Sequence, residues 1–255
     1  MQVIAFKVQP KSRFMSQPDN ARKFEVNCTS CNLRELCMPA GLCLDDLEQV
    51  QSIVYARRRV KRGESLFGTG DAFTAIYAIR SGTFKTSGVD GEGREQVTGF
   101  FMGGELLGMD GIGSGRYNGA AVALEDSEIC VMPYSLIESM AHDYPQLQRH
   151  LHAVLSREIV RDHGVMMLLG SMRAEERLAA FLSNLSKRFL RRGYSQSDFN
   201  LRMTREEIGS YLGLKLETVS RLFSQFQKDR LIEVEQKHVR ILDIAGVERL
   251  LGSAK

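Results

Sequence analysis

Four of the five cysteines in this chain lie within the seventeen-residue stretch NCTSCNLRELCMPAGLC. They are Cys28, Cys31, Cys37 and Cys43, and the fifth is Cys130. The N-terminal residues lack the apolar block of a secretion signal, so we expect a cytoplasmic protein whose thiols stay reduced. In that setting a cysteine cluster indicates a metal or redox site rather than a disulfide framework. Thiolates from one chain can bind tetrahedral zinc or an iron–sulfur cluster.

The spacing of these thiols bears on the choice between the two. Zinc sites often combine two C-x2-C pairs, whereas this chain has one such pair, Cys28 with Cys31. The irons of a cubane cluster spread over a wider cage, so unevenly spaced ligands suit it. The spacing therefore favours a cluster and leaves zinc or direct thiol redox chemistry open.

A second motif, REEIGSYLGLKLETVSRLFSQF near the C-terminus, matches a helix-turn-helix. Thr204 and Glu207 have the spacing of a capping box at the start of the first helix. Gly209 allows the two helices to approach closely, and Gly213 lies at the turn between them. The apolar inner faces consist of Ile208, Leu212, Leu214, Val219 and Leu222. The motif predicts a DNA-binding domain, with an ordinary helical hairpin as the alternative.

Three polar residues of the second helix lie at positions i, i+3 and i+4 and therefore share one face: Glu217, Ser220 and Arg221. Arg221 could donate two hydrogen bonds to guanine, Glu217 could accept one from cytosine, and Ser220 could contact a neighbouring base. The alternative is a solvated salt bridge between Glu217 and Arg221, worth about 0.3 kcal/mol. The surrounding motif favours base recognition.

Basic residues are concentrated in the C-terminal third. Residues 173 to 255 carry 16 Lys and Arg against 11 Asp and Glu, a net charge of +5, while residues 1 to 172 carry −2. We therefore expect any polyanionic partner at the C-terminal end. The candidate phosphate contacts are Lys187, Arg188, Arg191, Arg192, Arg202 and Lys215.

The elements that must position these motifs change along the chain. From about residue 50 to 135, short strand-like runs such as AIYAIR and SEICVMP alternate with glycine turns, which predicts an antiparallel β-roll. Pro145 begins a long stretch with helical spacing, and a second amphipathic helix follows at 173 to 193. Residues 232 to 241 alternate around a polar turn, as in a hairpin.

Within the long helix, apolar residues and one acid follow spacings of 4, 3, 4 and 3: Leu155, Ile159, Asp162, Met166 and Leu169. Either the helix packs only on its own domain, with Asp162 at a solvated border, or this seam pairs with a second copy. In a parallel dimer the two Asp162 side chains would lie close together and repel each other. Such a dimer would be weak, and another feature would have to stabilise it.

A cysteine cluster, a β-roll, a long helix and a helix-turn-helix, in that order over residues 28 to 245, resemble the CRP/FNR family of bacterial transcription regulators. The segments AIRSGTFK, GMDGIGSG, AEERLAAFL and YLGLKLETVSRLF look like its FNR branch, the regulators of fumarate and nitrate respiration. That branch has C-x2-C-x5-C and a distant fourth cysteine, so the resemblance implies a [4Fe-4S] cluster bound by Cys28, Cys31, Cys37 and Cys130. Cys43 is then a buried small hydrophobe or a substitute ligand.

The resemblance implies an oxygen-responsive transcription regulator and not an enzyme. With the cluster present, the family forms a homodimer that binds palindromic TTGAT-like DNA and activates or represses genes of anaerobic metabolism. Oxygen degrades the cluster and favours the monomer. The expected protein partner is RNA polymerase, at the hairpin around VDGEGR. The alternative is a family member that uses the cysteines for zinc or direct thiol redox sensing.

Cyclic nucleotides are not expected as ligands. The nucleotide-binding branch of the family has a Gly-Glu and, further on, an Arg-Ser/Thr-Ala that pairs with the phosphate. This chain keeps Gly104 and Glu105 but reads NGA at 118 to 120, without the arginine.

We therefore expect an α+β protein without a membrane segment. Its predicted parts are a mobile tail (1–27), an iron–sulfur-binding segment with a cyclic-nucleotide-binding-like β-roll (28–143), a dimerisation helix (144–171) and a winged helix-turn-helix domain (172–255).

Overall fold

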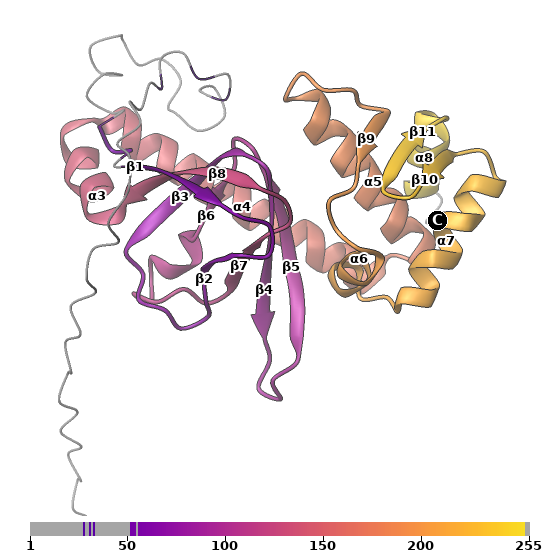
Figure 1. The fold of residues 1–255 in the computed structure, drawn as a ribbon, viewed down its shortest axis with the longest axis horizontal. Coiled ribbons are helices and arrows are strands. Elements are labelled where there is room, and N and C mark those ends of the chain that lie inside the picture. The colour runs from indigo at the N-terminus through magenta and orange to yellow at the C-terminus, as the bar shows by residue number, and fades with distance from the viewer. Residues whose placement is uncertain (1–27, 29–30, 32, 34–51, 55, 253–255) are drawn as a thin grey trace, which may run out of the picture.

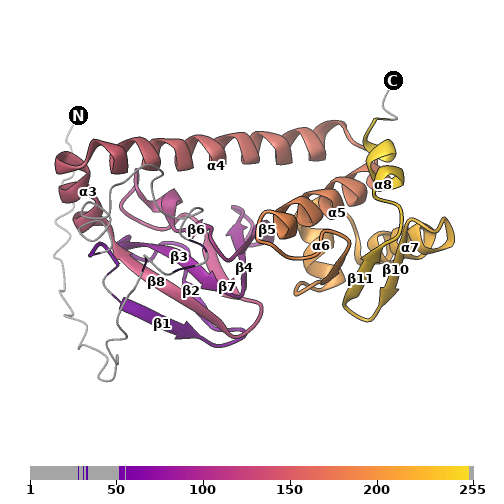
Figure 2. The ribbon, with the colours of Figure 1, turned by 90° about the horizontal axis from the view of Figure 1, so that it is seen from above.

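The computed structural model describes residues 28, 31, 33, 52–54 and 56–252. Cys37, Cys43 and the predicted tail lie outside the described residues. Figure 1 shows a β-rich N-terminal body beside a helical C-terminal body, and Figure 2 shows one long helix running along both. This arrangement confirms the predicted α+β fold class.

The N-terminal body is a β-roll of two four-stranded antiparallel sheets. One sheet has the strand order β1-β8-β3-β6 and the other has the order β2-β7-β4-β5. The strands are β1 Ala56–Val60, β2 Ser65–Phe67, β3 Ala75–Ser81, β4 Thr83–Val89, β5 Glu95–Met102, β6 Leu106–Leu107, β7 Ala120–Ala123 and β8 Ser127–Pro133.

Successive side chains of β3 and β8 point to opposite faces of their sheet, so only every second one enters the interior of the roll. Tyr77, Ile79 and Ile129 belong to the core between the two sheets. Ala78 and Cys130 are strand partners on the opposite face, where a separate apolar cluster forms. Cys130 therefore faces away from the interior of the roll.

The helices that follow the roll connect the two bodies. A 3-10 turn, η1 Met109–Gly111, lies between β6 and β7, and α3 Tyr134–Asp143 follows β8. The predicted long helix is α4 Pro145–Ser171, with its proline in the first turn. The sequence reading missed α3 as a helix of its own. Among the described residues, no helix has the length and apolarity needed to cross a membrane.

The C-terminal body combines helices with a small sheet. Its elements are α5 Ala174–Leu190, β9 Asp198–Asn200, α6 Arg205–Leu212, α7 Leu216–Lys228, β10 Ile232–Glu235, β11 His238–Ile241 and α8 Ile244–Leu251. The predicted hairpin is confirmed as β10 and β11. β9, which was not predicted, pairs with β11 and completes a three-stranded sheet.

A largely buried ion-pair network joins the two bodies. The carboxylate of Glu105, between β5 and β6, accepts hydrogen bonds from Arg188 at 2.5 and 3.1 Å and from Arg192 at 2.6 Å. Arg188, in the last turn of α5, also donates to the carbonyl oxygen of Phe100, and Arg192, just after α5, donates to that of Gly103. Burial raises the pKa of Glu105, but the two positive charges outweigh burial and hold this pKa below its usual value. Burial also lowers the pKa of Arg192, yet a guanidinium stays charged at neutral pH.

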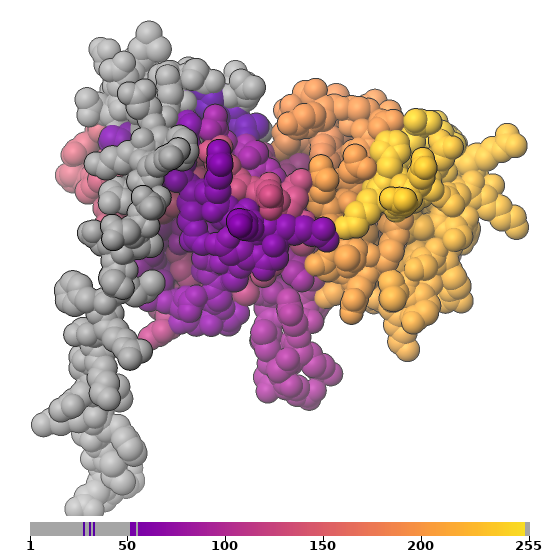
Figure 3. Space-filling model, in the orientation of Figure 1, coloured from indigo at the N-terminus to yellow at the C-terminus, as the bar shows by residue number. Residues whose placement is uncertain are grey.

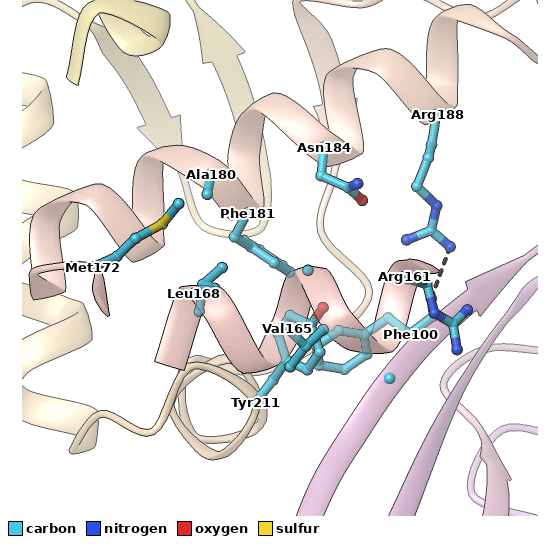
Figure 4. A pocket seen from close by; sticks show the side chains of 12 residues that line it. Phe100, Arg161, Val165, Leu168, Met172, Ala180, Phe181, Asn184, Arg188 and Tyr211 are labelled. Atoms are coloured by element: carbon cyan, nitrogen blue, oxygen red, sulfur yellow. Dashed lines mark hydrogen bonds between the residues drawn. The ribbon is translucent and has the colours of Figure 1, made fainter. Parts of the chain in front are cut away.

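An aromatic cluster extends this interface. The Phe100 ring of β5 packs edge to face against Phe181 of α5, with centroids 6.0 Å apart, and against Tyr211 of α6 at 5.3 Å. Figure 4 shows these rings beside a pocket of about 250 Å³ that α4, α5 and β5 line, with Arg161 and Arg188 at one end. Aromatic burial and ion pairing therefore act at the same interface.

Replacing Glu105 with glutamine leaves two mostly buried guanidinium groups without their counter-charge. We expect Glu105→Gln to lower the free energy of unfolding by about 3 kcal/mol at pH 7. The pKa of Glu105 is lower in the folded state than in the unfolded state. The contribution of its charge to the free energy of unfolding is therefore complete above the unfolded-state pKa of about 4.3, and it is lost as the pH falls through the folded-state pKa. The difference between the proteins should therefore shrink in acid.

Urea unfolding at pH 7 and at about pH 4 measures this difference. Glu64→Gln is the matched control, because Glu64 pairs with Arg58 at the surface and each side chain is at least 40% exposed. Its loss should change the free energy of unfolding by less than about 1 kcal/mol. Equal effects of the two substitutions would contradict the buried role of Glu105.

Candidate functional site

Three of the four predicted cysteine ligands lie among the described residues, and the structure brings them together. Cys28 is buried in the apolar cluster on the outer face of the β1-β8-β3-β6 sheet, and Cys130 packs against that cluster. The backbone N–H of Cys31 donates to the carbonyl of Cys28 at 3.3 Å. Cys37 lies outside the described residues.

The surroundings of these thiols are apolar but carry positive charge. Burial, together with the neighbouring Cys130 and Cys31, raises the pKa of the Cys28 thiol to about 11. Burial likewise raises the pKa of Cys130. Arg57 and Arg80 oppose the rise at both thiols. Without a metal centre the thiols of Cys28 and Cys130 stay protonated at neutral pH, so binding of a metal centre must release their protons.

Among the described residues, which do not include Cys37, no three His, Cys, Asp or Glu side chains form a group that could hold a metal ion. The chemistry of the donors is what bears on the kind of group that these residues fit. The Nε atom of Arg57, opposite Cys130, is buried without a hydrogen-bond partner in the described part of the chain. Thiol donors and an unmatched cationic donor fit an anionic iron–sulfur group.

The helix-turn-helix forms as predicted. The Thr204 hydroxyl accepts from the N–H of Glu207 at 3.1 Å, and the Glu207 carboxylate accepts from the N–H of Thr204 at 2.7 Å. Gly213 ends α6 with a left-handed φ of 63°. A Cβ on Gly209 would lie 2.6 Å from the carbonyl oxygen of Leu214, so a side chain there would collide with the turn.

Helix α7 buries one face and exposes the other. Its buried residues are Val219, Leu222, Phe223 and Phe226. Glu217, Ser220 and Arg221 all lie on the exposed face. Among the described residues no ion pair joins Glu217 to Arg221, so the salt bridge considered as an alternative does not form. The polar atoms of this face remain available to a partner.

Two of the six candidate phosphate contacts are wrong for this structure. Arg188 and Arg192 direct their guanidinium groups at Glu105, and their side chains are only 16% and 6% exposed. A sequence gives the positions of charges but not which charge finds an internal partner. The other four candidates are exposed: Lys187, Arg191, Arg202 and Lys215.

Helix α4 exposes most of the predicted seam. Ile159 is 56% and Met166 61% exposed, and the Asp162 side chain between them is 68% exposed. Leu155 and Leu169 are partly buried. Leu155, Ile159 and Asp162 also line a pocket between α4 and the β-roll. The exposed part of this face presents apolar side chains around one carboxylate.

A second pocket, of about 540 Å³, lies between the β-roll and α4. Along its wall the backbone N–H groups of Asn118 and Gly119 donate to the Asp110 carboxylate at 2.8 and 2.9 Å. Two adjacent amides of this kind can bind a phosphate, but here the chain supplies its own anion. The sequence reading did not identify Asp110.

Known proteins share this arrangement. Residues 57–144 match the family model of the cyclic nucleotide-binding domain, and residues 176–250 match that of the Crp-like helix-turn-helix domain. The chain is 45% identical over 227 residues to the transcriptional regulatory protein btr of Bordetella pertussis, covering 89% of this chain and 94% of that protein.

Two further relatives extend the likeness. The chain is 40% identical over 230 residues to the fumarate and nitrate reduction regulatory protein of Escherichia coli K12, covering 90% of this chain and 92% of that one. The solved structure of FixK2 from Bradyrhizobium japonicum is similar with a TM-score of 0.71 at 27% identity, covering 78% of this chain and 98% of that chain.

A methyl group at Gly209 should disrupt the helix-turn-helix. We expect Gly209→Ala to lower the free energy of unfolding by about 2 kcal/mol, because the Leu214 carbonyl must move. Gly164→Ala is the control, since nothing lies within 4 Å of its added Cβ on α4. The control should stabilise the protein by up to about 1 kcal/mol. Urea unfolding measures both, and a tolerated Gly209→Ala would contradict the close approach.

Proposed function

The chain belongs to the FNR branch of the CRP/FNR family of bacterial transcription regulators, and on this basis we propose that it is a cytoplasmic, oxygen-responsive regulator that binds a [4Fe-4S] cluster. The observation that carries the proposal is the convergence of Cys28, Cys31 and Cys130 on one face of the β-roll. Cys37 completes the set of four thiolates. When bound, the cluster would react with oxygen, and this reaction would end in loss of the cluster.

The cysteines connect two parts of the chain that are distant in sequence. Cys28 and Cys31 belong to the N-terminal segment, whereas Cys130 lies in β8. Leu33 of the same segment packs on the turn after β5, where its Cδ1 would lie 3.1 Å from a Cβ on Gly103. The Gly103 carbonyl accepts a hydrogen bond from Arg192, just after α5, at 2.6 Å. A short series of contacts thus leads from the cysteine segment to the DNA-binding domain.

Two copies pair through the exposed seam of α4 in the proposed active form. Ile159 and Met166 supply apolar surface, and Asp162 supplies repulsion that keeps the dimer weak. The ordering of the cysteine segment then decides the balance between monomer and dimer. The two recognition helices of a dimer read half-sites about one DNA turn apart.

The DNA sites are palindromic and TTGAT-like, and the readers are Glu217, Ser220 and Arg221 of α7. The protein activates or represses genes of anaerobic metabolism and is not an enzyme. RNA polymerase contacts the β4–β5 hairpin, which projects from the body in Figure 3. Its turn is held by Asp90, which accepts from the N–H groups of Glu92 and Arg94 at 2.9 and 3.0 Å.

Cyclic nucleotides do not bind in this proposal, although the domain keeps the fold. The Asp110 carboxylate satisfies the amides of Asn118 and Gly119. Glu105, the acid of the Gly-Glu motif, pairs with Arg188 of α5 and with Arg192 just after it. A phosphate brought next to Asp110 would meet a like charge.

Replacing Cys130 with serine tests the proposed cofactor. Prepared without air, the wild-type protein should contain about four irons and four sulfides per chain, and Cys130→Ser should lose most of both along with anaerobic DNA binding. Cys43→Ser is the matched control and should keep them. Full DNA binding by Cys130→Ser, or stoichiometric zinc in the wild-type protein, would favour zinc or thiol redox sensing instead.

Replacing Arg221 with alanine tests the recognition face. We expect binding to a TTGAT-like palindrome to weaken about 10- to 100-fold, because a bidentate contact to guanine contributes about 1 to 3 kcal/mol. Gln225→Ala, an exposed position further along α7, is the control and should bind within about twofold. Fluorescence anisotropy at fixed salt measures both variants, and equal affinities would remove Arg221 from the reading surface.

A further inference from the structure

Arg57 holds a buried polar atom that none of the described residues satisfies. Its Nε, on β1, is shielded from solvent and has no hydrogen-bond partner in the described part of the chain. A buried N–H without an acceptor destabilises a fold, and such atoms are uncommon in proteins. The atom therefore indicates a ligand or group that accepts its hydrogen bond.

The strand register places Arg57 directly across from Cys130. The two residues are Cα partners in the antiparallel pair of β1 and β8, strands that run side by side in Figures 1 and 2. Directly opposite residues on antiparallel strands present their side chains on the same face. The partner of Cys130 on its other side is Ala78 of β3, which has only a methyl group to offer. Arg57 is thus the polar cross-strand neighbour of Cys130.

Arg57 also differs from the other cation near the thiols. Arg80 already donates to the Glu128 carboxylate at 3.0 Å. Both arginines oppose the effect of burial on the pKa of Cys28 and Cys130, which places their positive charge near the thiols. Arg57 therefore combines a charge beside the cysteines with an unused donor.

We propose that Arg57 is a positioning residue for the iron–sulfur group, giving it a buried N–H donor and a positive charge at the Cys130 side. An iron–sulfur group held by four thiolates is anionic, and hydrogen bonds to its sulfurs are among the factors that set its reduction potential. Arg57 thereby slows the loss of iron. This inference rests on the proposed function, because the acceptor is the cluster and its ligands.

The test compares cluster retention in three variants of the full chain. Arg57→Leu removes donor and charge, Arg57→Lys keeps the charge but removes the Nε–H, and Arg59→Leu removes an exposed charge two residues along β1. Each protein is reconstituted without air, its iron and sulfide are counted, and its visible absorption is followed under argon with a ferrous chelator. Thermal unfolding of the cluster-free proteins is measured alongside.

We expect Arg57→Leu to lose iron about tenfold faster than the wild-type protein, because a hydrogen bond to a charged group is lost. Arg57→Lys should fall between them, and Arg59→Leu should match the wild type within about twofold. Without the cluster, Arg57→Leu should unfold at the same temperature as the wild type or a higher one, because an unsatisfied buried donor has been removed.

The outcomes separate this inference from the proposed function. If the wild-type protein binds neither iron nor sulfide, the proposed function fails and the role of Arg57 fails with it. If the wild type binds both and Arg57→Leu retains iron equally well, only the role of Arg57 is overturned. A cluster-free Arg57→Leu that unfolds at a lower temperature, or does not fold, would show that Arg57 supports the apoprotein and would also overturn the proposal.

Discussion

The pairing of one largely buried carboxylate, Glu105, with Arg188 at the end of α5 and Arg192 just after it is the interaction on which the arrangement of the two bodies depends. Each of these three groups would be costly to bury alone, and the pairing offsets that cost only while the β5–β6 turn and α5 stay in register. The surrounding rings of Phe100 and Phe181 add apolar burial but less directional constraint. Glu105 is thus a central group among those that fix the C-terminal body on the β-roll, beside the ion pair of Lys85 with Glu207.

The proposed sensory site lies close to this network. The backbone N–H of Ile79 donates to the Glu105 carbonyl at 3.0 Å, and the preceding residue, Ala78, is the strand partner of Cys130. Leu33 reaches the neighbouring Gly103 from the cysteine segment. A change in how that segment packs would therefore act on the residues that hold α5. In the proposed function, this change in packing accompanies the gain or loss of the cluster. Because the dimer formed through the α4 seam is weak, the change shifts the equilibrium between dimer and monomer.

The sequence predicted what depends on local pattern and missed what depends on tertiary partners. The capping box of Thr204 and the left-handed turn at Gly213 follow from residue type and spacing, and both are present. The long helix α4 followed from periodicity, and its role as a dimer seam stays a prediction. The roles of Arg188, Asp110 and Arg57 could not be predicted in this way, because each depends on a group at least eight residues away in sequence. The sequence made Arg188 a candidate DNA contact, whereas in the structure its guanidinium group pairs with Glu105.

Absorption spectroscopy and light scattering on a single anaerobic sample test the central claim most directly. We expect a brown protein with a broad visible absorption band and the mass of a dimer. Admission of air should bleach the band and shift the mass towards the monomer at a similar rate, because the same group supports both. A colourless protein, or one whose dimer persists unchanged after complete bleaching, would contradict the proposed link between the cysteine site and the α4 seam.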